Sequence, residues 1–89
     1  MTVRVFGTNT CNKCKAICKG LDAIRIPYNF IDADADENQD ICDRFFVDCL
    51  PHVQLIDDKG DIVWQQAERV TLYAILAKLL QLKKPNETK

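Results

Sequence analysis

Cys11 and Cys14 are the residues of this 89-residue chain whose type and spacing best suit chemistry. The motif Cys11-Asn12-Lys13-Cys14 follows a short apolar run that ends at Gly7, and it opens a segment with helical periodicity. Unpaired N–H groups and the positive end of the dipole at a helix N-terminus stabilise a thiolate. Two thiols at this spacing can also close onto each other. The motif therefore predicts a site that holds or releases two electrons.

The two cysteines occupy different positions on the predicted helix. Cys11 lies at the helix start and outside the apolar stripe, whereas Cys14 begins the stripe and should face the core. Lys13 and Lys15 add positive charge beside the turn, which favours a thiolate further. We therefore expect Cys11 to be the more acidic of the two thiols.

The composition is that of an ordinary globular domain, with 47% hydrophobic and 28% charged residues. The formal net charge of -1 gives no electrostatic reason to bind nucleic acid or an anionic membrane. The sequence has no apolar stretch of about twenty residues and no signal-peptide pattern at its start, and five cysteines are an odd count for a disulfide scaffold. We expect a single domain spanning residues 1–89, in the cytoplasm, with proteins or small molecules as partners.

Hydrophobic periodicity and turn residues predict seven elements that position the cysteines. They are a strand at 2–7, a helix at 11–25, a strand at 28–31, a helix at about 37–47, strands at 53–56 and 61–64, and a helix at about 68–82, followed by a polar tail at 83–89. The helix positions expected to face the core are Cys14, Ile17, Cys18, Leu21 and Ile24, then Ile41, Cys42, Phe45 and Phe46, then Leu72, Tyr73, Ile75, Leu76, Leu79, Leu80 and Leu82.

The order of these elements predicts an α/β fold with a four-stranded mixed sheet and three flanking helices. A right-handed crossover makes the first two strands parallel. The turn at 57–60, with Gly60 at the position of positive φ, makes the last two strands antiparallel. Helices should cover both faces of the sheet.

Three features together resemble the thioredoxin superfamily. They are Cys11-x-x-Cys14 after the first strand, Leu50-Pro51 before the third strand, and the element order over residues 2 to about 82. The small size makes the chain most similar to a glutaredoxin or a glutaredoxin-like thioredoxin. The resemblance implies a thioredoxin fold and a dithiol-disulfide oxidoreductase, in which Cys11 attacks a substrate disulfide and Cys14 resolves the mixed disulfide. It also implies a cis bond before Pro51 and substrate contacts from Thr10, Asn12, Lys13, Leu50 and Pro51.

The chain departs from both groups of relatives that it resembles. Where glutaredoxins carry a Gly-Gly-type turn and an acidic residue that bind glutathione, this chain reads Gln-Gln-Ala-Glu-Arg at 65–69. Where thioredoxins carry a buried acid, this chain has Val5, and Leu50 replaces the usual Thr or Val. The resemblance implies a disulfide-containing protein substrate, with ribonucleotide reductase or a similar enzyme as the leading target. Thioredoxin reductase or glutathione would be the reductant. The resemblance also implies a monomer, and we expect it to bind no cofactor.

The remaining cysteines and the single histidine leave alternatives open. Cys18 and Cys42 fit core positions on helices, although a regulatory disulfide between Cys18 and Cys14 is the sharper hypothesis. For Cys49, two residues before Pro51, a place near the active-site surface where the thiol takes glutathione or is oxidised is the less favoured alternative to a thiol without a regulatory role. His52 is interpreted as a side chain on the third strand. Zinc or an iron–sulfur cluster is a weaker hypothesis, because helix packing already explains Cys18 and Cys42, so we predict no metal ligands. A thioredoxin-like module that binds a protein without turnover is the main non-enzymatic alternative.

Overall fold

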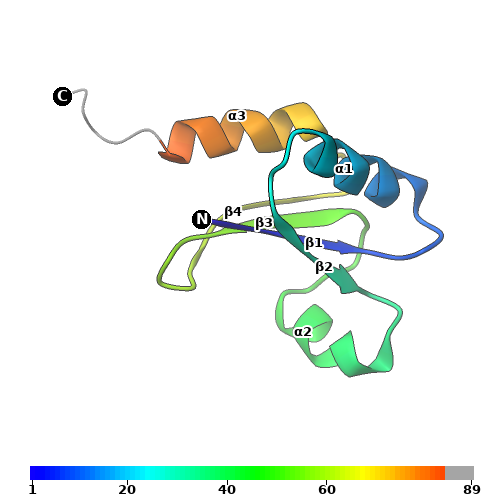
Figure 1. Cartoon of the computed structure of the whole chain (residues 1–89). Coiled ribbons are helices and arrows are strands. Elements are labelled where there is room, and N and C mark those ends of the chain that lie inside the picture. Colours follow the sequence, from blue (N-terminus) through cyan, green and yellow to red (C-terminus); the bar gives the residue numbers. More distant parts are fainter. Residues whose placement is uncertain (84–89) are drawn as a thin grey trace.

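The computed structural model describes residues 1–83 (Figure 1). Its elements are β1 (Thr2–Gly7), α1 (Asn12–Ala23), β2 (Tyr28–Asp32), the short 3₁₀ helix η1 (Asp36–Asn38), α2 (Gln39–Arg44), β3 (His52–Ile56), β4 (Ile62–Ala67) and α3 (Leu72–Lys83). The strands form one sheet in the order β2-β1-β3-β4, in which β1 pairs parallel with β2 and antiparallel with β3, and β3 pairs antiparallel with β4. The predicted fold class and topology are confirmed.

The main core lies between the sheet and the two helices α1 and α3, which cover the same face (Figure 1). Side chains alternate across the sheet, so Val3 and Val5 of β1 join Val53 and Leu55 of β3 on this face. The helices and the segment before α3 complete the cluster with Ile17, Leu21, Val70, Ile75 and Leu79. Helix α2 covers the other face of the sheet (Figure 1). The packing of α1 in the main core fixes the position of its N-terminus relative to the sheet.

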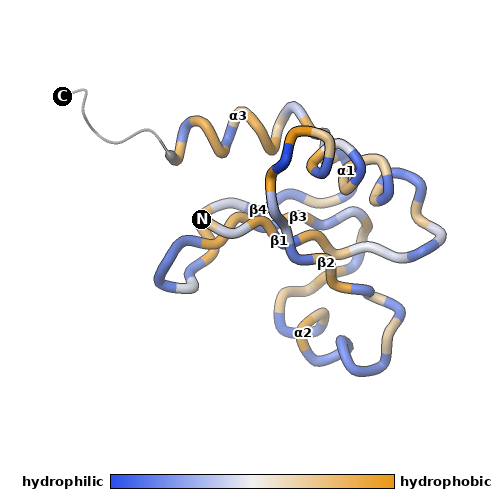
Figure 2. The backbone as a smooth tube through the Cα atoms, viewed as in Figure 1, coloured by the Kyte–Doolittle hydropathy of each residue, from blue (hydrophilic) through white to orange (hydrophobic). Residues whose placement is uncertain are grey.

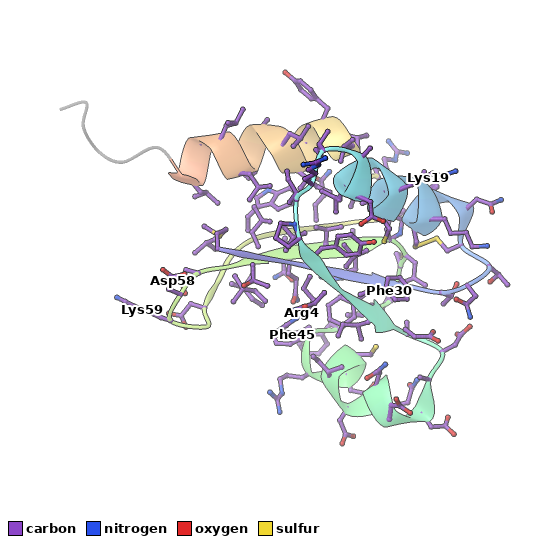
Figure 3. The ribbon with its side chains drawn as sticks, in the orientation of Figure 1. Arg4, Lys19, Phe30, Phe45, Asp58 and Lys59 are labelled. Carbon is purple, nitrogen blue, oxygen red and sulfur yellow. A yellow bond between two sulfur atoms is a disulfide. The ribbon has the colours of Figure 1, made fainter. Side chains whose placement is uncertain are left out.

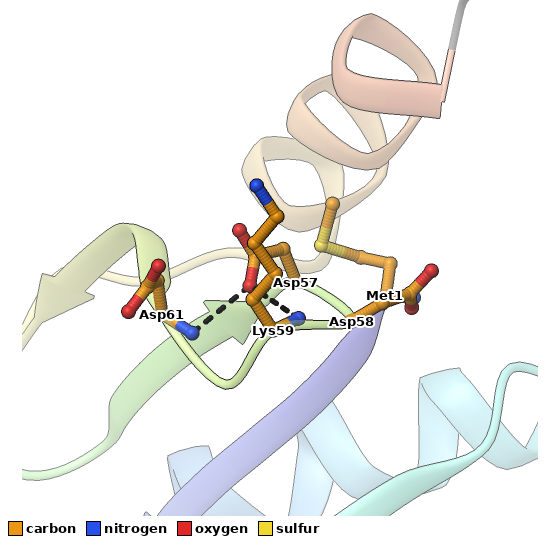
Figure 4. Close-up of polar contacts among 5 residues, drawn as sticks. All are labelled: Met1, Asp57, Asp58, Lys59 and Asp61. Atoms are coloured by element: carbon orange, nitrogen blue, oxygen red, sulfur yellow. Dashed lines mark hydrogen bonds and ion pairs between the residues drawn. The ribbon is translucent and has the colours of Figure 1, made fainter.

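The hairpin between β3 and β4 has the predicted turn, and Asp57 organises it (Figure 4). One carboxylate oxygen of Asp57 accepts hydrogen bonds from the backbone N–H groups of Lys59 and Asp61, each at 2.9 Å. Gly60 has a φ of 91°, which glycine adopts without the penalty of a Cβ atom. Beside the turn, Asp58 accepts a hydrogen bond from the N-terminal amino group of Met1 at 3.1 Å, which ties β1 to the hairpin.

Helix α1 ends at Ala23, two residues before the predicted end. Ile24 caps the helix and Arg25 adopts a left-handed conformation with a φ of 61°. The N–H of Ile26 then bonds to the carbonyl of Leu21 at 2.9 Å, which is the hydrogen bond of a Schellman motif. The prediction that Ile24 faces the core is wrong, because the turn leaves this residue 43% exposed.

The second helical segment is shorter than the predicted helix at about 37–47. It consists of η1 followed by α2, and α2 ends at Arg44 with Phe45 as its cap. Phe46 adopts a left-handed conformation with a φ of 54° and is 83% exposed, so its predicted place in the core is wrong. Cys42 is buried as expected. Helix α2 ends early because a second Schellman motif follows it, in which the N–H of Val47 bonds to the carbonyl of Cys42.

Helix α3 begins at Leu72 and not near residue 68. Glu68 adopts a left-handed conformation with a φ of 73°, which turns the chain after β4. Thr71 is the N-cap of α3, because its hydroxyl accepts a hydrogen bond from the Ala74 N–H at 3.1 Å. Strand β4 accordingly extends three residues past its predicted end, to Ala67. Ile75 and Leu79 are buried as expected, but three predicted core residues are exposed: Tyr73 at 80%, Leu80 at 68% and Leu82 at 36%.

The predicted polar tail at 83–89 begins inside α3, whose last residue is Lys83, and its residues 84–89 lie outside the described part of the chain. Within residues 1–83 no helix is long and apolar enough to cross a lipid bilayer.

Candidate functional site

Cys11 and Cys14 form a disulfide at the N-terminus of α1, with their Cα atoms 5.3 Å apart. Cys11 is the N-cap of the helix in an extended conformation, and its sulfur accepts a hydrogen bond from the Cys14 N–H at 3.2 Å. The N–H of Cys11 bonds to the carbonyl of Thr8, also at 3.2 Å, which closes the turn between β1 and α1. The sulfur of Cys11 therefore occupies the place where helix N–H groups would stabilise a thiolate.

The two sulfurs have different access to solvent. Cys14 is fully buried, whereas Cys11 is only half-buried. The buried sulfur of Cys14 lies 3.9 Å from the carbonyl oxygen of Phe6 and packs against Gly7 at the end of β1. A reactant arriving from solvent can thus reach Cys11 and not Cys14.

The charges around the disulfide favour a thiolate on Cys11. Lys13 and Lys15 are exposed on the first turns of α1, and this helix has no acidic residue in its first turn. Thr10 and Asn12 are exposed on either side of Cys11, and the Thr10 hydroxyl lies 3.3 Å from that of Thr8. These side chains form the rim of the site.

The Leu50-Pro51 bond is cis, as the resemblance implies. Pro51 is buried and Leu50 is half-buried at the start of β3. The carbonyl of Pro51 accepts a hydrogen bond from the N–H of Glu68 at 2.8 Å, so the segment before β3 and the segment after β4 are joined. The sequence pattern did not indicate that Glu68 would bond to the Pro51 carbonyl, because this bond depends on the left-handed conformation of Glu68.

A small groove begins at the cysteine motif and continues toward α3. It has a volume of about 200 Å³, and its lining residues are Lys13, Ala16, Ile17, Val70, Thr71 and Leu72. The structure therefore brings Lys13 together with the segment that follows β4, whereas Leu50 and Pro51 are not among the described residues that line this groove. The sequence did not indicate that Lys13 lies beside Val70 and Thr71, because it placed these two residues inside a helix that in the structure begins only at Leu72.

The three other cysteines are free and differ in exposure. Cys18 is half-buried, Cys42 is buried and Cys49 is exposed. Burial raises the pKa of the Cys18 thiol and of the Cys42 thiol, and the neighbouring carboxylates Asp22 and Asp43 raise them further. Their neutral forms suit core packing, as predicted.

His52 is a buried side chain on β3, as the sequence indicated. Its Nε2 lies 3.0 Å from the Gln65 side-chain oxygen, to which it donates, and its buried Nδ1 has no hydrogen-bond partner among residues 1–83. Within residues 1–83 no three His, Cys, Asp or Glu side chains come together in a group able to hold a metal ion.

The chain is similar to known proteins in its structure and not in its sequence. No protein-family model matches the sequence, and no curated protein matches it significantly. Thioredoxin 1 from Thermosipho africanus superposes with a TM-score of 0.77 at 19% identity, over 92% of this chain and 93% of that one.

Two further solved structures are similar over a large part of their length. Thioredoxin f2 from Chlamydomonas reinhardtii has a TM-score of 0.79 at 18% identity, over 94% of this chain and 80% of that one. Thioredoxin f2 in complex with ferredoxin:thioredoxin reductase has a TM-score of 0.78 at 14% identity, over 93% and 77%. At such low identity these matches establish a shared fold, so the chain has the thioredoxin fold with a Cys-x-x-Cys pair at the start of α1.

Proposed function

We propose that this protein is a thiol-disulfide oxidoreductase that reduces disulfides in other proteins through Cys11 and Cys14. One observation carries the proposal: the two cysteines are bonded at a helix N-terminus, with Cys11 half-buried and Cys14 fully buried. A structural disulfide would not need one sulfur at the surface beside two lysines. The arrangement suits a pair that opens and closes during turnover.

The reaction follows from this asymmetry in access. The Cys11 thiolate attacks one sulfur of a substrate disulfide, forms a mixed disulfide with it and releases the other substrate sulfur as a thiolate, which takes up a proton. The Cys14 thiol then loses its proton and attacks the Cys11 sulfur, which restores the internal disulfide and releases the second substrate thiol. Two electrons pass to the substrate, so a separate reductant must return two electrons to Cys11 and Cys14.

The substrate and the reductant are narrower proposals. The resemblance to glutaredoxin-like thioredoxins supports ribonucleotide reductase or a similar cytoplasmic enzyme as the target. A reductase is supported as electron donor by the structure in which thioredoxin f2 is bound to ferredoxin:thioredoxin reductase. Glutathione is the second candidate donor, and Gln66 and Arg69 would supply polar groups to bind it. Gln65 points to the opposite face of β4, where its side-chain oxygen already bonds to His52 and Gln54.

The test is an equilibrium titration of the protein in glutathione redox buffers. Alkylation and mass spectrometry would count reduced Cys11 and Cys14, the internal disulfide and any glutathione adduct. A potential of about -270 mV would indicate a thioredoxin-type protein fed by a reductase, and about -200 to -230 mV with an adduct on Cys11 would indicate a glutaredoxin. Failure to form a reversible disulfide would rule out the proposed function and leave the non-enzymatic binding module.

A further inference from the structure

Phe30 lies on β2 with its side chain on the same side of the sheet as α1. β2 is an outer strand, and Phe30 is paired with Val5 of β1, whose side chain is in the main core. Phe30 is nevertheless 41% exposed, and β2 shows hydrophobic colour between hydrophilic stretches (Figure 2). An aromatic side chain therefore stands at the open edge of the sheet, close to the helix that carries the cysteine pair (Figure 3).

The Phe30 ring meets the sulfur of Cys14 above Gly7. The point that a Cβ atom of Gly7 would occupy is 2.8 Å from the Cys14 sulfur and 3.1 Å from the Cε1 atom of Phe30. These two atoms are therefore at most about 6 Å apart, in the range where a sulfur and the edge of an aromatic ring attract each other. Because Gly7 has no side chain, the ring and the sulfur share the space above it.

The Phe30 ring separates Cys14 from solvent at this edge of the sheet. Cys14 is fully buried, whereas Cys11 in the same turn is half-buried. Toward β1, the Cys14 sulfur faces the carbonyl oxygen of Phe6. Toward β2, no further strand follows in the sheet that residues 1–83 form, so the sheet ends at the Phe30 ring, which is partly in solvent.

Tyr28, the preceding aromatic residue on this face of β2, is held in a different way. It interacts with Cys18, one turn after Cys14 on α1, and its hydroxyl donates a hydrogen bond to Asp22 at 3.2 Å. Phe30 has no polar group, so apolar contacts alone hold its ring over Cys14. A substitution of Phe30 therefore removes the cover of Cys14 without breaking a side-chain hydrogen bond.

We propose that Phe30 closes Cys14 to reactants from solvent and so makes Cys11 the point of attack, an inference that rests on the proposed function. In the reduced protein, a substrate disulfide then meets the Cys11 thiolate first. In the oxidised protein, the thiolate of the reductant attacks the Cys11 sulfur, and the Cys14 sulfur leaves as a thiolate that takes up a proton. Phe30 contacts neither substrate nor reductant in this role. It is a positioning residue that decides which of the two sulfurs reacts.

The test measures the reactivity of Cys14 in the reduced Cys11→Ser variant, alone and combined with Phe30→Ala, Phe30→Met or Val63→Ala. Each protein is treated with iodoacetamide at about pH 8, and tandem mass spectrometry follows the modification of Cys14 and of buried Cys42. Phe30→Ala should raise the rate at Cys14 at least about tenfold and leave the rate at Cys42 unchanged, because a methyl group cannot cover the sulfur.

Two of these variants are controls for the size and the position of the side chain. Phe30→Met should react nearly as slowly as the Cys11→Ser parent, since an unbranched apolar chain reaches as far as the Cε atoms of the ring. Val63→Ala should also react as the parent does. Val63 is a matched control because it is likewise 41% exposed and lies on β4, the opposite outer strand of the sheet.

Glutathione disulfide gives a second readout, which a merely structural role of Phe30 would not move. In the Cys11→Ser, Phe30→Ala protein, the Cys14 thiolate should attack one sulfur of glutathione disulfide and form a mixed disulfide with it. The other glutathione leaves as a thiolate and takes up a proton. The Cys11→Ser parent and its Val63→Ala variant should form no adduct at Cys14 over the same time.

Three results would overturn the proposal. They are an unchanged rate at Cys14 in Phe30→Ala, the absence of its glutathione adduct, or an equal acceleration of Cys14 and Cys42. The last result would show that Phe30 only stabilises the fold, because Cys42 is buried on α2 at the other face of the sheet (Figure 1). Failure of the wild-type protein to reduce a protein disulfide would contradict the proposed function instead, since neither measurement on Cys14 requires turnover.

Discussion

Gly7 and Cys14 approach each other so closely that no side chain fits between them. A Cβ atom at Gly7 would lie 2.7 Å from the Cys14 Cβ and 2.8 Å from its sulfur, and 3.1 Å from the ring of Phe30. The absence of a side chain at the end of β1 is what lets α1 place its buried cysteine against the sheet. Gly7 is thus part of the site although it has no functional group.

The variant Gly7→Ala should therefore disturb both stability and redox chemistry. The added methyl group must push Cys14 away from β1, because the Cys14 Cβ and its bonded sulfur cannot move aside as the end of a flexible side chain can. We expect a loss of about 1–3 kcal/mol in the free energy of unfolding, measured by urea denaturation of the oxidised protein. The potential of the Cys11 and Cys14 pair should also change. A variant with wild-type stability and potential would show that this contact does not position Cys14.

The two cysteines of the site should respond differently to substitution. Cys11→Ser should abolish reduction of a protein disulfide such as that of insulin, because the remaining thiol is buried. Cys14→Ser should still attack but should accumulate a mixed disulfide on Cys11, since nothing displaces the substrate. Mass spectrometry of trapped adducts checks this. Activity that survives in Cys11→Ser would contradict the proposed nucleophile and favour a binding module.

The order of elements and the cysteine site could be predicted because they depend on local sequence. Gly, Pro and acidic turns separate apolar runs with clear periods, and the Cys-x-x-Cys motif falls at one of these boundaries. Helix ends were less predictable for a physical reason. Arg25, Phe46 and Glu68 adopt left-handed conformations where glycine would be the usual signal, so no residue type marked these turns.

The contacts of the site could not be predicted for a different reason. The approach of Gly7 to Cys14 and the bond from Glu68 to the Pro51 carbonyl join residues from separate elements. Each contact depends on how the elements pack together in three dimensions. Neither the hydrophobic period of a segment nor a short sequence motif predicts this packing. Exposure on α3 has the same origin, because Tyr73 and Leu80 fit an apolar pattern and tertiary packing decides which of two apolar faces is buried.

Arg4 should stabilise the face of the sheet that α2 covers. Its guanidinium donates a hydrogen bond to the side-chain oxygen of fully buried Gln54 at 2.9 Å and lies 5.5 Å from the centre of the Phe45 ring (Figure 3). Arg4→Met removes the donor and leaves a buried oxygen unpaired, so we expect a loss of about 1–3 kcal/mol in the free energy of unfolding.

The double variant Arg4→Met with Gln54→Leu should recover part of this loss, because an apolar pair leaves no unsatisfied oxygen. Urea denaturation of wild type, both single variants and the double variant measures the coupling. If the double variant lost the full sum of the single losses, the hydrogen bond between Arg4 and Gln54 would contribute nothing to stability.

The free thiols should react in an order set by burial and by their pKa values. Burial raises the pKa of Cys18 and of Cys42, so at pH 8 both hold less thiolate than an ordinary cysteine, and Cys49 is exposed. Iodoacetamide should therefore modify Cys49 first, at least about tenfold faster than buried Cys42. As pH rises above 9.0, the rates at Cys18 and Cys42 should continue to increase, because the pKa of each thiol is raised above that ordinary value. Peptide mass mapping over time checks the order, and equal rates at Cys42 and Cys49 would contradict it.

Phe46 and Gly60 form a matched pair for testing backbone conformation, because both have a positive φ and little around them. Phe46 has a φ of 54° with 83% of its surface exposed, and Gly60 has a φ of 91° with open space within 4 Å of the position that a Cβ atom would take. Phe46→Gly should stabilise the fold by about 0.5–1 kcal/mol, since the strain of a left-handed aromatic residue exceeds the entropy that glycine adds to the unfolded chain. Gly60→Ala should destabilise it by about 1 kcal/mol for the opposite reason. Thermal and urea denaturation measure both changes. If Phe46→Gly destabilised the protein, the exposed ring would be making contacts that offset its backbone strain.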